Sequence, residues 1–378
     1  MKILFVLTYY RPHWTGLSQY AARLAEGLAK RGHQVEVLCS QHDKKLSSYE
    51  EINKVKVFRV PFLFKFLRSV IMPKFPLELW KRARENEAVI VYLPLQEVLL
   101  IAIICKILGR KLFLVHNGDL VLPKDCGFFC RLVEKIYYWT TGLAIGWSEK
   151  IIVQTKDYAD LSPLLNKFKE KWAIILPLYE TMKVANKDIV EFKKKYSLPN
   201  KKLIGFSGRF VEEKGVDYLL KTIPLVVKRY PGVHFVFAGD YKIQYEKFWE
   251  RIKNLVEENK KNLTLLGLIK DQKKVFTFYK SLDVYVQPSR TDCFPSSLVE
   301  AMLCGVPAVC TNIPGTRWSV LKTGMGEVVE PKNPEALAEG ILKVLSNIEI
   351  YTKNSKNVRK IFDYQKTLDQ YERLLSQS

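Results

Sequence analysis

The sequence of 378 residues lacks an apolar run long enough to cross a lipid bilayer. A spanning helix needs about 20 consecutive apolar residues, and the longest candidate, Val98–Leu108, is followed by Gly-Arg-Lys. The apolar segment Ile3–Leu7 lacks the small-residue cleavage site of a secretion signal and runs directly into Tyr9-Tyr10-Arg11-Pro12. We therefore expect a core helix at the first place and an opening β-strand at the second.

The sequence also lacks a disulfide framework. Its seven cysteines are odd in number, scattered, and mostly placed in apolar runs, which predicts reduced, packed thiols and a cytoplasmic protein. Cys126 and Cys130 form the only close pair, and no two further ligands lie near them. Zinc needs four such ligands in a structural site, so we do not expect a zinc site at this pair.

Acidic residues are too few to balance the basic ones. The chain has 60 Lys and Arg against 39 Asp and Glu, a formal net charge of +21, and the excess is spread over both halves of the sequence. It favours anionic partners, which include nucleotide phosphates, anionic lipid and nucleic acid. A basic helix, a zinc finger and an RNA-binding aromatic motif are all missing, so nucleic acid is not the expected partner.

Short apolar strands alternate with helical segments along the whole chain. The strands of the first series are expected at 2–8, 34–39, 55–60, 89–92, 111–116, 151–154 and 173–176, and those of the second at 203–206, 233–238, 262–266, 284–287 and 306–310. A polar, Lys-rich connector at 183–202 separates the series. This pattern predicts an α/β protein with two doubly wound parallel-sheet domains. The expected active cleft lies at the carboxyl ends of the strands.

One segment, residues 290–309, places the carboxylates of Asp292 and Glu300 on either side of a predicted helix start. Pro295, Ser296 and Ser297 mark that start. Both carboxylates could then face a hydroxyl-rich or anionic ligand at the N–H groups of the helix N-terminus. The alternative is structural, because Ser297-x-x-Glu300 also fits a capping box.

A second segment, Gly208-Arg209-Phe-Val-Glu-Glu-Lys214-Gly215, follows the first strand of the second series and precedes a helix predicted at 216–229. A glycine turn with two cations at a helix start can hold a diphosphate, since Arg grips phosphate oxygens with its fork and Lys adds a point charge. The alternative is a solvated turn, in which these cations pair with Glu212 or Glu213.

Two segments of the first series could also carry chemistry. Gly16 follows the first strand and precedes a helix, and it would let the backbone approach a phosphate or sugar. The surrounding sequence does not match G-x-G-x-x-G, so a nicotinamide or flavin cofactor is not expected. His116-Asn-Gly-Asp119 ends the strand at 111–116 and points His116 toward the predicted cleft; the alternative is a histidine satisfied by loop backbone.

Residues 61–84 mix bulky apolar residues with six cations and one anion. A basic, amphipathic element of this kind can lie in the interface of an anionic membrane. The alternative is a helix packed on the sheet with its cations in water.

Taken together, these segments resemble the family 4 glycosyltransferases over essentially the whole chain. Asp292-x7-Glu300, followed by Ala-Met-Leu-Cys-Gly-Val-Pro, is similar to the family's E-x7-E signature. Gly208-Arg209-x4-Lys214-Gly215 matches a second hallmark. Tyr10-Arg-Pro-x3-Gly16, His116 and Pro288-Ser289 follow the expected order. The resemblance implies a GT-B fold, with an N-terminal domain of residues 1–180 plus 360–378 and a C-terminal, donor-binding domain of residues 181–359.

The resemblance also implies roles for individual residues. Arg209 and Lys214 would neutralise the diphosphate of a UDP or GDP sugar, Glu300 would bind the ribose, and Asp292 would contact the donor sugar. His116 would lie near the anomeric carbon, and no cofactor or metal would be needed. The implied catalytic residues are thus His116, Arg209, Lys214 and Asp292, and the implied substrate-binding residues are Gly16, Asp119, Ile269, Phe294, Pro295, Ser296, Ser297 and Glu300.

Some residues depart from the family pattern. Asp292 is one methylene shorter than the usual Glu, Cys293 replaces a usual Gly, and Trp318 stands where Glu is common. The expected activity is retaining hexosyl transfer to a lipid-linked, glycolipid or surface-polysaccharide acceptor by a cytoplasmic enzyme. Such an enzyme could be peripheral on the inner face of the cell membrane. The alternatives are a GT-B glucosyltransferase with a soluble acceptor and a non-catalytic module that binds nucleotide sugars.

Overall fold

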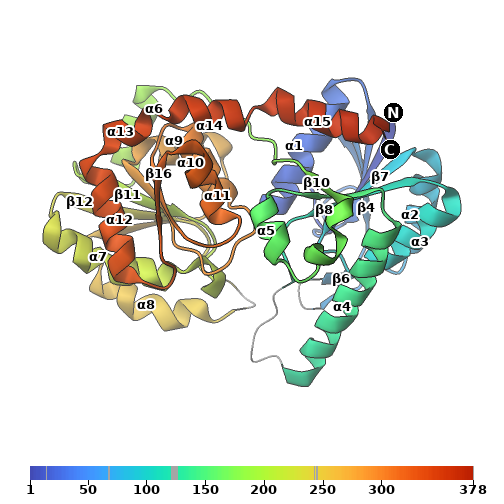
Figure 1. Cartoon of the computed structure of the whole chain (residues 1–378), viewed down its shortest axis with the longest axis horizontal. Coiled ribbons are helices and arrows are strands. Elements are labelled where there is room, and N and C mark those ends of the chain that lie inside the picture. The colour runs from blue at the N-terminus through green and yellow to red at the C-terminus, as the bar shows by residue number, and fades with distance from the viewer. Residues whose placement is uncertain (14, 67–68, 121–126, 242, 244–245, 378) are drawn as a thin grey trace. The chain divides into compact units, whose positions relative to one another are not determined.

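A computed structural model describes the chain except residues 14, 67–68, 121–126, 242, 244–245 and 378 (Figure 1). It contains two compact units. Unit 1 comprises Met1–Leu178 and Asp363–Ser378, and unit 2 comprises Tyr179–Phe362. These limits lie within three residues of the boundaries expected from the sequence. The chain thus returns to unit 1 at its C-terminal end.

Unit 1 is built on an eight-stranded sheet of order β10-β9-β8-β7-β1-β2-β4-β3. Its strands are β1 (Lys2–Val6), β2 (Gln34–Ser40), β3 (Tyr49–Ile52), β4 (Val55–Val60), β7 (Ala88–Leu93), β8 (Lys111–His116), β9 (Lys150–Val153) and β10 (Trp172–Ile174). All neighbours pair in parallel except β3, which runs antiparallel to β4. The order reverses between β1 and β7.

Alternation along β1 divides the core of unit 1 into two layers. Leu4 and Val6 face a layer completed by α2 (Phe75–Glu85), α3 (Val98–Leu108), the end of α4 (Gly127–Trp147) and α5 (Lys156–Leu161). Ile3 and Phe5 face the opposite layer, covered by α1 (Gly16–Lys30) and α15 (Tyr364–Gln377).

The C-terminal helix α15 is secured beside α1 (Figure 1). Arg31, which follows α1, pairs with Asp369 at 2.6 Å and with Glu372 at 2.5 Å. The Tyr364 hydroxyl donates to the carbonyl of Arg23 at 3.3 Å. These contacts explain why the last helix belongs to the first unit.

Unit 2 is built on a six-stranded parallel sheet of order β13-β12-β11-β14-β15-β16. Its strands are β11 (Lys202–Ser207), β12 (Val233–Ala238), β13 (Leu263–Gly267), β14 (Val284–Gln287), β15 (Ala308–Thr311) and β16 (Gly326–Val329). The order reverses between β11 and β14, which makes this junction a topological switch point.

Helices cover both faces of the unit 2 sheet. They are α6 (Asn186–Lys195), α7 (Val216–Arg229), α8 (Phe248–Glu258), α9 (Gln272–Ser281), α10 (Ser296–Leu303), α11 (Thr316–Thr323), α12 (Pro334–Ser346), α13 (Ile348–Thr352) and α14 (Ser355–Ile361). One core layer joins the sheet to α7, α8 and α12. Short 3-10 turns lie at Leu165–Lys171 and Glu212–Lys214.

The structure differs from the sequence-based expectation at a few elements. β3 and the hairpin of β5 (Phe64–Phe66) and β6 (Ser69–Ile71) were not expected, nor was the edge strand β16. β3 reads as polar because it is a half-exposed edge strand, and β16 is too short and too little buried to give a strong apolar run. The last helical residues of the chain form two helices, α14 and α15, which belong to different units.

Among the described residues, no helix is both long and apolar enough to cross a membrane.

Candidate active site

The strongest cluster of predicted site residues lies at the switch point of unit 2. The loop after β11 carries Arg209 and Lys214, and the loop after the neighbouring strand β14 carries Asp292. Glu300 follows on α10. Because the carboxyl ends of adjacent parallel strands meet at one edge of a sheet, both signature segments converge there, where open α/β sheets bind their ligands.

An ion pair joins the two loops directly. The ammonium of Lys214 lies 2.5 Å from the Asp292 carboxylate, and both side chains are mostly buried. The Ser289 hydroxyl also approaches this carboxylate, at 3.4 Å. Neither Glu212 nor Glu213 is the partner of Lys214, so for this residue the solvated-turn alternative is wrong.

Two glycines fix these loops by close contact. Gly215 has φ +66°, and a Cβ there would lie 2.0 Å from the carbonyl oxygen of Pro288. Gly315 has φ +80°, and its Cβ would lie 1.8 Å from the carbonyl oxygen of Cys293. No side chain fits at either position, so the loop before α7 and the loop before α11 both press on the Asp292 loop.

The helix α10 begins at Ser296, as predicted, but it is not closed by a capping box. Its N-cap is Pro295, and the N-terminus receives no hydrogen bond from the N-cap side chain. The Ser297 hydroxyl instead donates to Gln287 Oε1 at 3.2 Å. The capping-box alternative is therefore wrong, and the first N–H groups of α10 are not capped by the serine that was expected to cap them.

Glu300 lies one turn into α10 and is 9% exposed. The hydroxyl of Tyr279 donates to its Oε2 at 3.4 Å. Burial, and then the charge of Glu300, hold the pKa of Tyr279 well above its ordinary value, so this hydroxyl remains a donor at neutral pH. The Tyr279 hydroxyl is thus a fixed hydrogen-bond donor to the Glu300 carboxylate.

Buried hydrogen bonds continue from this tyrosine to Asp292. The Tyr279 hydroxyl lies 2.9 Å from Ser207 Oγ, and the Tyr285 hydroxyl lies 3.2 Å from the Ser207 carbonyl, to which it donates. The Tyr285 hydroxyl lies 3.0 Å from Gln287 Oε1, and Gln287 Nε2 donates to Ser289 Oγ at 2.8 Å. Ser289 reaches Asp292. A chain of buried polar groups therefore links the two signature carboxylates beneath the site.

Sequence reasoning missed this polar chain. Gln287 and Ser289 are almost fully buried, and a buried glutamine is uncommon because its amide needs partners on both sides. The signal was therefore present as a Gln at the end of an apolar strand, Val284–Gln287, immediately before Pro288-Ser289. We assign Gln287 a positioning role, since it contacts neither predicted cation.

The two other cations of the site differ in their contacts: Arg209 is partly exposed, and Arg290 is held in a structural ion pair. Arg209 lies 3.0 Å from Glu213 and keeps 44% of its side chain exposed, so the ion-pair alternative is confirmed for this residue. Arg290 forms a two-pronged pair with Asp217, at 2.9 and 2.6 Å, and stacks over Tyr218. Arg290 therefore ties the Asp292 loop to α7.

Trp318, one of the residues that depart from the family pattern, belongs to an aromatic cluster. The ring of Phe294 lies 6.2 Å from those of both Trp318 and Phe362. Phe294 and Cys293 are buried, so their side chains pack within unit 2. Trp318 therefore has a packing role in this chain. Ile269 is also buried and follows β13.

In unit 1, His116 and Asp119 form a second, smaller cluster. His116 ends β8 and is 1% exposed, and its Nε2 lies 3.4 Å from the Asp119 carboxylate. Asp119 also accepts from Tyr158 at 2.9 Å and Ser162 at 2.8 Å. Burial raises the pKa of Asp119, but the hydrogen bonds from His116, Ser162 and Tyr158 outweigh it and leave that pKa below its ordinary value.

The ring of His116 is satisfied by this carboxylate and not by loop backbone, as the alternative would require. Its Nδ1 is buried and has no hydrogen-bond partner among the described residues. The backbone carbonyl of His116 accepts from Gln154 Nε2 at 2.6 Å. The pair is therefore held in place with one ring nitrogen left for a further partner.

Gly16 is the first residue of α1, with Thr15 as N-cap. A Cβ built on Gly16 meets no atom within 4 Å. Unlike Gly215 and Gly315, Gly16 is therefore not required by contacts within its own unit.

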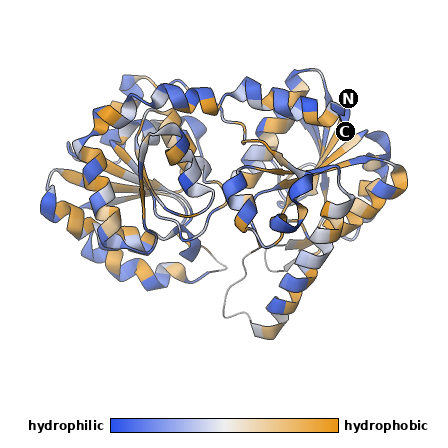
Figure 2. Ribbon diagram, in the orientation of Figure 1, coloured by the Kyte–Doolittle hydropathy of each residue, from blue (hydrophilic) through white to orange (hydrophobic). Residues whose placement is uncertain are grey.

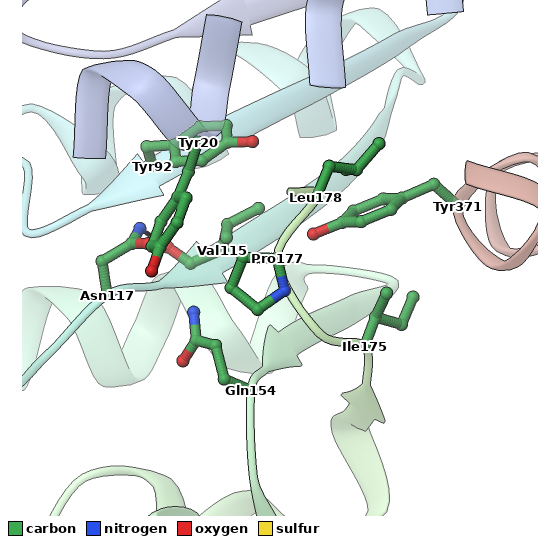
Figure 3. Close-up of a pocket in the computed structure, with 9 residues that line it drawn as sticks. All are labelled: Tyr20, Tyr92, Val115, Asn117, Gln154, Ile175, Pro177, Leu178 and Tyr371. Carbon is green, nitrogen blue, oxygen red and sulfur yellow. Dashed lines mark hydrogen bonds between the residues drawn. The ribbon is translucent and has the colours of Figure 1, made fainter. Parts of the chain in front are cut away.

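A small pocket of unit 1 lies beside β8 (Figure 3). It is lined by Tyr20, Tyr92, Val115, Asn117, Gln154, Ile175, Pro177, Leu178 and Tyr371. None of the predicted site residues is among them, although Gln154 supports the His116 backbone. The pocket is therefore next to the residues that support His116 and does not include the predicted site residues.

Some sequence-based assignments fall outside the described residues. They are Cys126 and the side chain of Cys130, which formed the close cysteine pair, and Arg68 with the side chain of Lys65 in the basic segment 61–84. Within the described ranges, no group of three His, Cys, Asp or Glu residues is arranged to hold a metal ion.

Both units match known families. Residues 14–175 match the family described as "Glycosyltransferase Family 4", and residues 188–361 match "Glycosyl transferases group 1". The chain is 26% identical over 368 residues to an "uncharacterized glycosyltransferase" of Methanocaldococcus jannaschii, covering 92% of this chain and 90% of that protein.

Two further proteins are similar over most of this chain. The phosphatidylinositol N-acetylglucosaminyltransferase GPI3 subunit of Saccharomyces cerevisiae is 22% identical, with 96% of this chain and 80% of that protein covered. The crystal structure of Anabaena Alr3699/HepE in complex with UDP-glucose superposes with a TM-score of 0.78 at 17% identity, over 100% of both chains. The two-unit architecture is the GT-B fold, as the sequence predicted.

Proposed function

Because the chain belongs to the family 4 glycosyltransferases, we propose that it transfers a hexose from a nucleotide-diphosphate sugar, with retention of configuration, to a lipid-linked or surface-polysaccharide acceptor. Its standing as a glycosyltransferase rests on the matched families. The donor, the stereochemistry and the acceptor are the proposed parts.

One observation carries the donor assignment. The cations Arg209 and Lys214 and the carboxylates Asp292 and Glu300 converge at the switch point between β11 and β14. A nucleotide-diphosphate sugar combines an anion with two sets of hydroxyls, which are the groups that such a mixed cluster can bind. The similarity to a protein crystallised with UDP-glucose supports this assignment.

In the proposed reaction, the bond between the anomeric carbon and the diphosphate oxygen breaks, and the diphosphate leaves with the electron pair. A new bond forms from the acceptor hydroxyl oxygen, whose proton passes to the diphosphate or to solvent. Arg209 and Lys214 would stabilise the negative charge that develops on the leaving group. Asp292 would hold Lys214 in position through the 2.5 Å ion pair until the donor arrives.

Glu300 would bind the ribose hydroxyls, and the backbone near Ile269 would contact the base. The N–H groups at the start of α10 would bind donor oxygens, because Ser297 is turned away toward Gln287. From unit 1, Gly16 and the His116–Asp119 pair would contact the donor or the acceptor sugar. No metal is required, since the two cations supply the positive charge.

The lipid-linked acceptor is supported by a relative whose name specifies phosphatidylinositol as its acceptor. The exposed apolar surface of unit 1 gives it independent support, which the next subsection develops.

The reaction is tested with purified protein and a panel of UDP, GDP, ADP and CDP sugars, by measuring release of the nucleoside diphosphate. We expect one nucleotide to support turnover and the proton NMR spectrum of the product to show the anomeric configuration of the donor. An inverted anomer would contradict the retaining mechanism. Donor binding without turnover on any acceptor would favour the non-catalytic alternative.

A further inference from the structure

The helix α4 (Gly127–Trp147) extends away from the rest of unit 1 at its N-terminal end (Figure 1). Among residues 127–140 whose side chains are described, none is buried; the first buried residue is Thr141. This part of the helix is roughly 20 Å long. A helical segment of this length has little stability of its own in water, because most helices depend on tertiary packing.

The N-terminal part of α4, residues 127–140, carries an apolar stripe. Phe128, Leu132, Ile136 and Trp139 are spaced by four, four and three residues, so they share one face of the helix. They are 84%, 43%, 51% and 65% exposed, respectively. Apolar residues placed singly on a surface need no explanation, but a continuous stripe indicates a partner.

The neighbouring helix also has exposed apolar residues. α3 packs against α4, and its outward residues Ile103 and Ile107 are 39% and 65% exposed. At the end of α4, Trp147 is 42% exposed and lies under the Lys106 ammonium, 4.5 Å from the ring centroid. Both helices therefore carry exposed apolar side chains together with basic residues, and hydrophobic and hydrophilic residues alternate along the ribbon of α4 (Figure 2).

The charges beside the stripe distinguish between partners. Arg131 and Lys135 are exposed and lie one residue from Leu132 and Ile136, while Glu134 is only partly exposed. Lysine is depleted at protein–protein interfaces, whereas lysine and arginine flanking apolar and tryptophan side chains are typical of helices in a membrane interface. The net charge of +21 also favours an anionic surface.

We propose that the outer face of α4, with the adjoining residues of α3, lies in the interfacial layer of an anionic lipid membrane. Phe128, Leu132, Ile136 and Trp139 enter the boundary between headgroups and acyl chains, and Arg131 and Lys135 contact lipid phosphates. The helix lies on the membrane and does not cross it. This inference rests on the proposed lipid-linked acceptor and names the surface of the chain that would bind the membrane holding it. Vesicle binding tests the inference independently of the transferase reaction.

The basic segment 61–84, which the sequence indicated as a membrane element, lies elsewhere in unit 1 and stays a prediction. Within residues 61–84, Arg82 is drawn inward, since it pairs with Glu36 at 3.7 Å and Glu85 at 3.1 Å and stacks over Phe58. Leu77 and Trp80 of α2 remain 75% and 41% exposed. Leu63 and Phe64 are also exposed, at 71% and 54%. The described part of segment 61–84 therefore has as many exposed large apolar side chains as the stripe on α4, but the stripe lies along one face of a single helix.

The first test is co-sedimentation of the full chain with vesicles of equal parts phosphatidylglycerol and phosphatidylcholine. The double variant Leu132→Gln/Ile136→Gln should bind at least tenfold more weakly than wild type. The matched control is Leu321→Gln/Ile350→Gln in unit 2, whose side chains are 66% and 60% exposed, and it should bind like wild type. Equal binding by both variants would overturn the proposal.

The second test separates charge from apolar contact. Arg131→Gln/Lys135→Gln should weaken binding by about thirtyfold, at roughly 1 kcal/mol per basic residue near the surface, and vesicles of phosphatidylcholine alone should bind wild type more weakly. Brominated acyl chains should quench the fluorescence of wild type more than that of Trp139→Phe. Equal quenching in both would place Trp139 outside the membrane and contradict the proposal.

A second copy of the chain is the competing partner. If wild type forms a dimer in light scattering, and Leu132→Gln/Ile136→Gln abolishes the dimer while vesicle binding is absent throughout, the proposal is overturned. Release of nucleoside diphosphate in vesicle-free solution is measured in parallel. It should be unchanged in the α4 variants, so a failure of membrane binding is distinguishable from a failure of the proposed transferase reaction.

Discussion

The two units repeat one plan, a parallel sheet with a switch point, yet they hold their predicted site residues differently. In unit 2, Gly215 and Gly315 are forced by backbone contacts of 2.0 and 1.8 Å, and Lys214 is paired with Asp292. In unit 1, a Cβ on Gly16 would meet nothing within 4 Å. Unit 2 thus presents a preformed cluster, while the first loop of unit 1 leaves space that its own unit does not fill.

The two units also differ in how many large apolar side chains they expose. Of the twenty large apolar side chains that are exposed in the described part of the chain, fourteen belong to unit 1 and six to unit 2. Both halves of the sequence carry a similar basic excess, so charge alone does not separate the units. The fixed geometry of unit 2 suits the small polar ligand proposed for it, whereas the exposed apolar side chains of unit 1 suit the lipid surface proposed for that unit.

The largest expected effect comes from removing the cation of the preformed cluster. We expect Lys214→Ala to lower turnover by about 10²–10³-fold, the usual cost of losing one group that stabilises a developing negative charge. Nucleoside diphosphate release measures this loss. Lys253→Ala, which breaks an exposed pair with Glu250 on α8, is the control and should retain full turnover.

Loss of Lys214 also leaves Asp292 without its partner, which by itself could lower stability. The double variant Lys214→Ala/Asp292→Asn separates the two effects, since it removes the unpaired charge. Recovery of thermal stability without recovery of turnover is expected. Recovery of both would mean that Lys214 has only a structural role.

The comparison between Gly215 and Gly16 can be tested directly. Gly215→Ala should destabilise the fold by about 2–3 kcal/mol, because alanine is strained at a positive φ and collides with Pro288. Gly16→Ala should leave stability unchanged or raise it by about 0.5 kcal/mol, since alanine favours a helix, but it should lower turnover. Denaturant unfolding with kinetics distinguishes them, and full activity of Gly16→Ala would remove Gly16 from the site.

The role of the buried polar chain in unit 2 can be tested at Gln287. Gln287→Leu leaves Tyr285, Ser289 and Ser297 without a common partner, and we expect a loss of about 1–3 kcal/mol in stability. If the chain positions the carboxylates, the Michaelis constant for the donor should also rise. A variant that is destabilised but kinetically normal would show that the network serves packing only.

The smallest effect concerns Asp119 in unit 1 and depends on pH. Because the pKa of this carboxyl is lower in the folded chain than its ordinary value, its stabilising contribution is full above about pH 4 and is lost as the pH falls through the folded pKa. Asp119→Asn should therefore be less stable than wild type by about 1 kcal/mol at pH 7. The gap should narrow in acid; a gap that stays constant between pH 7 and pH 3 would contradict this account.

The sequence predicted most of the fold because its strands are short apolar runs in a regular alternation. The helix over 216–229 and the strands at 55–60, 111–116 and 284–287 have the predicted limits. The edge strands β3 and β16 were missed because exposed strands lack that apolar signal. The assignment of the last helix to unit 1 came from the family resemblance, and contacts such as Arg31 with Glu372 explain it.

The site was less accessible to sequence reasoning. Spacing placed Asp292 and Glu300 about one helix, but it could not show that Ser297 turns to Gln287 or that Lys214 pairs with Asp292. Both facts depend on the adjacency of β11 and β14, which are separated by two other strands in sequence. The apolar stripe of α4 was not identified from the sequence, because apolar residues at helical spacing fit a buried face as well as an exposed one.

The most direct measurement is the thermal stability of wild type and of Lys214→Ala with UDP, GDP, ADP and CDP. A nucleotide at about 100 times its dissociation constant should stabilise wild type by about 2.7 kcal/mol. The account predicts that one diphosphate stabilises wild type and fails to stabilise the variant. Stabilisation of neither protein by any diphosphate would contradict the central claim, that the switch point of unit 2 holds the nucleotide-sugar donor.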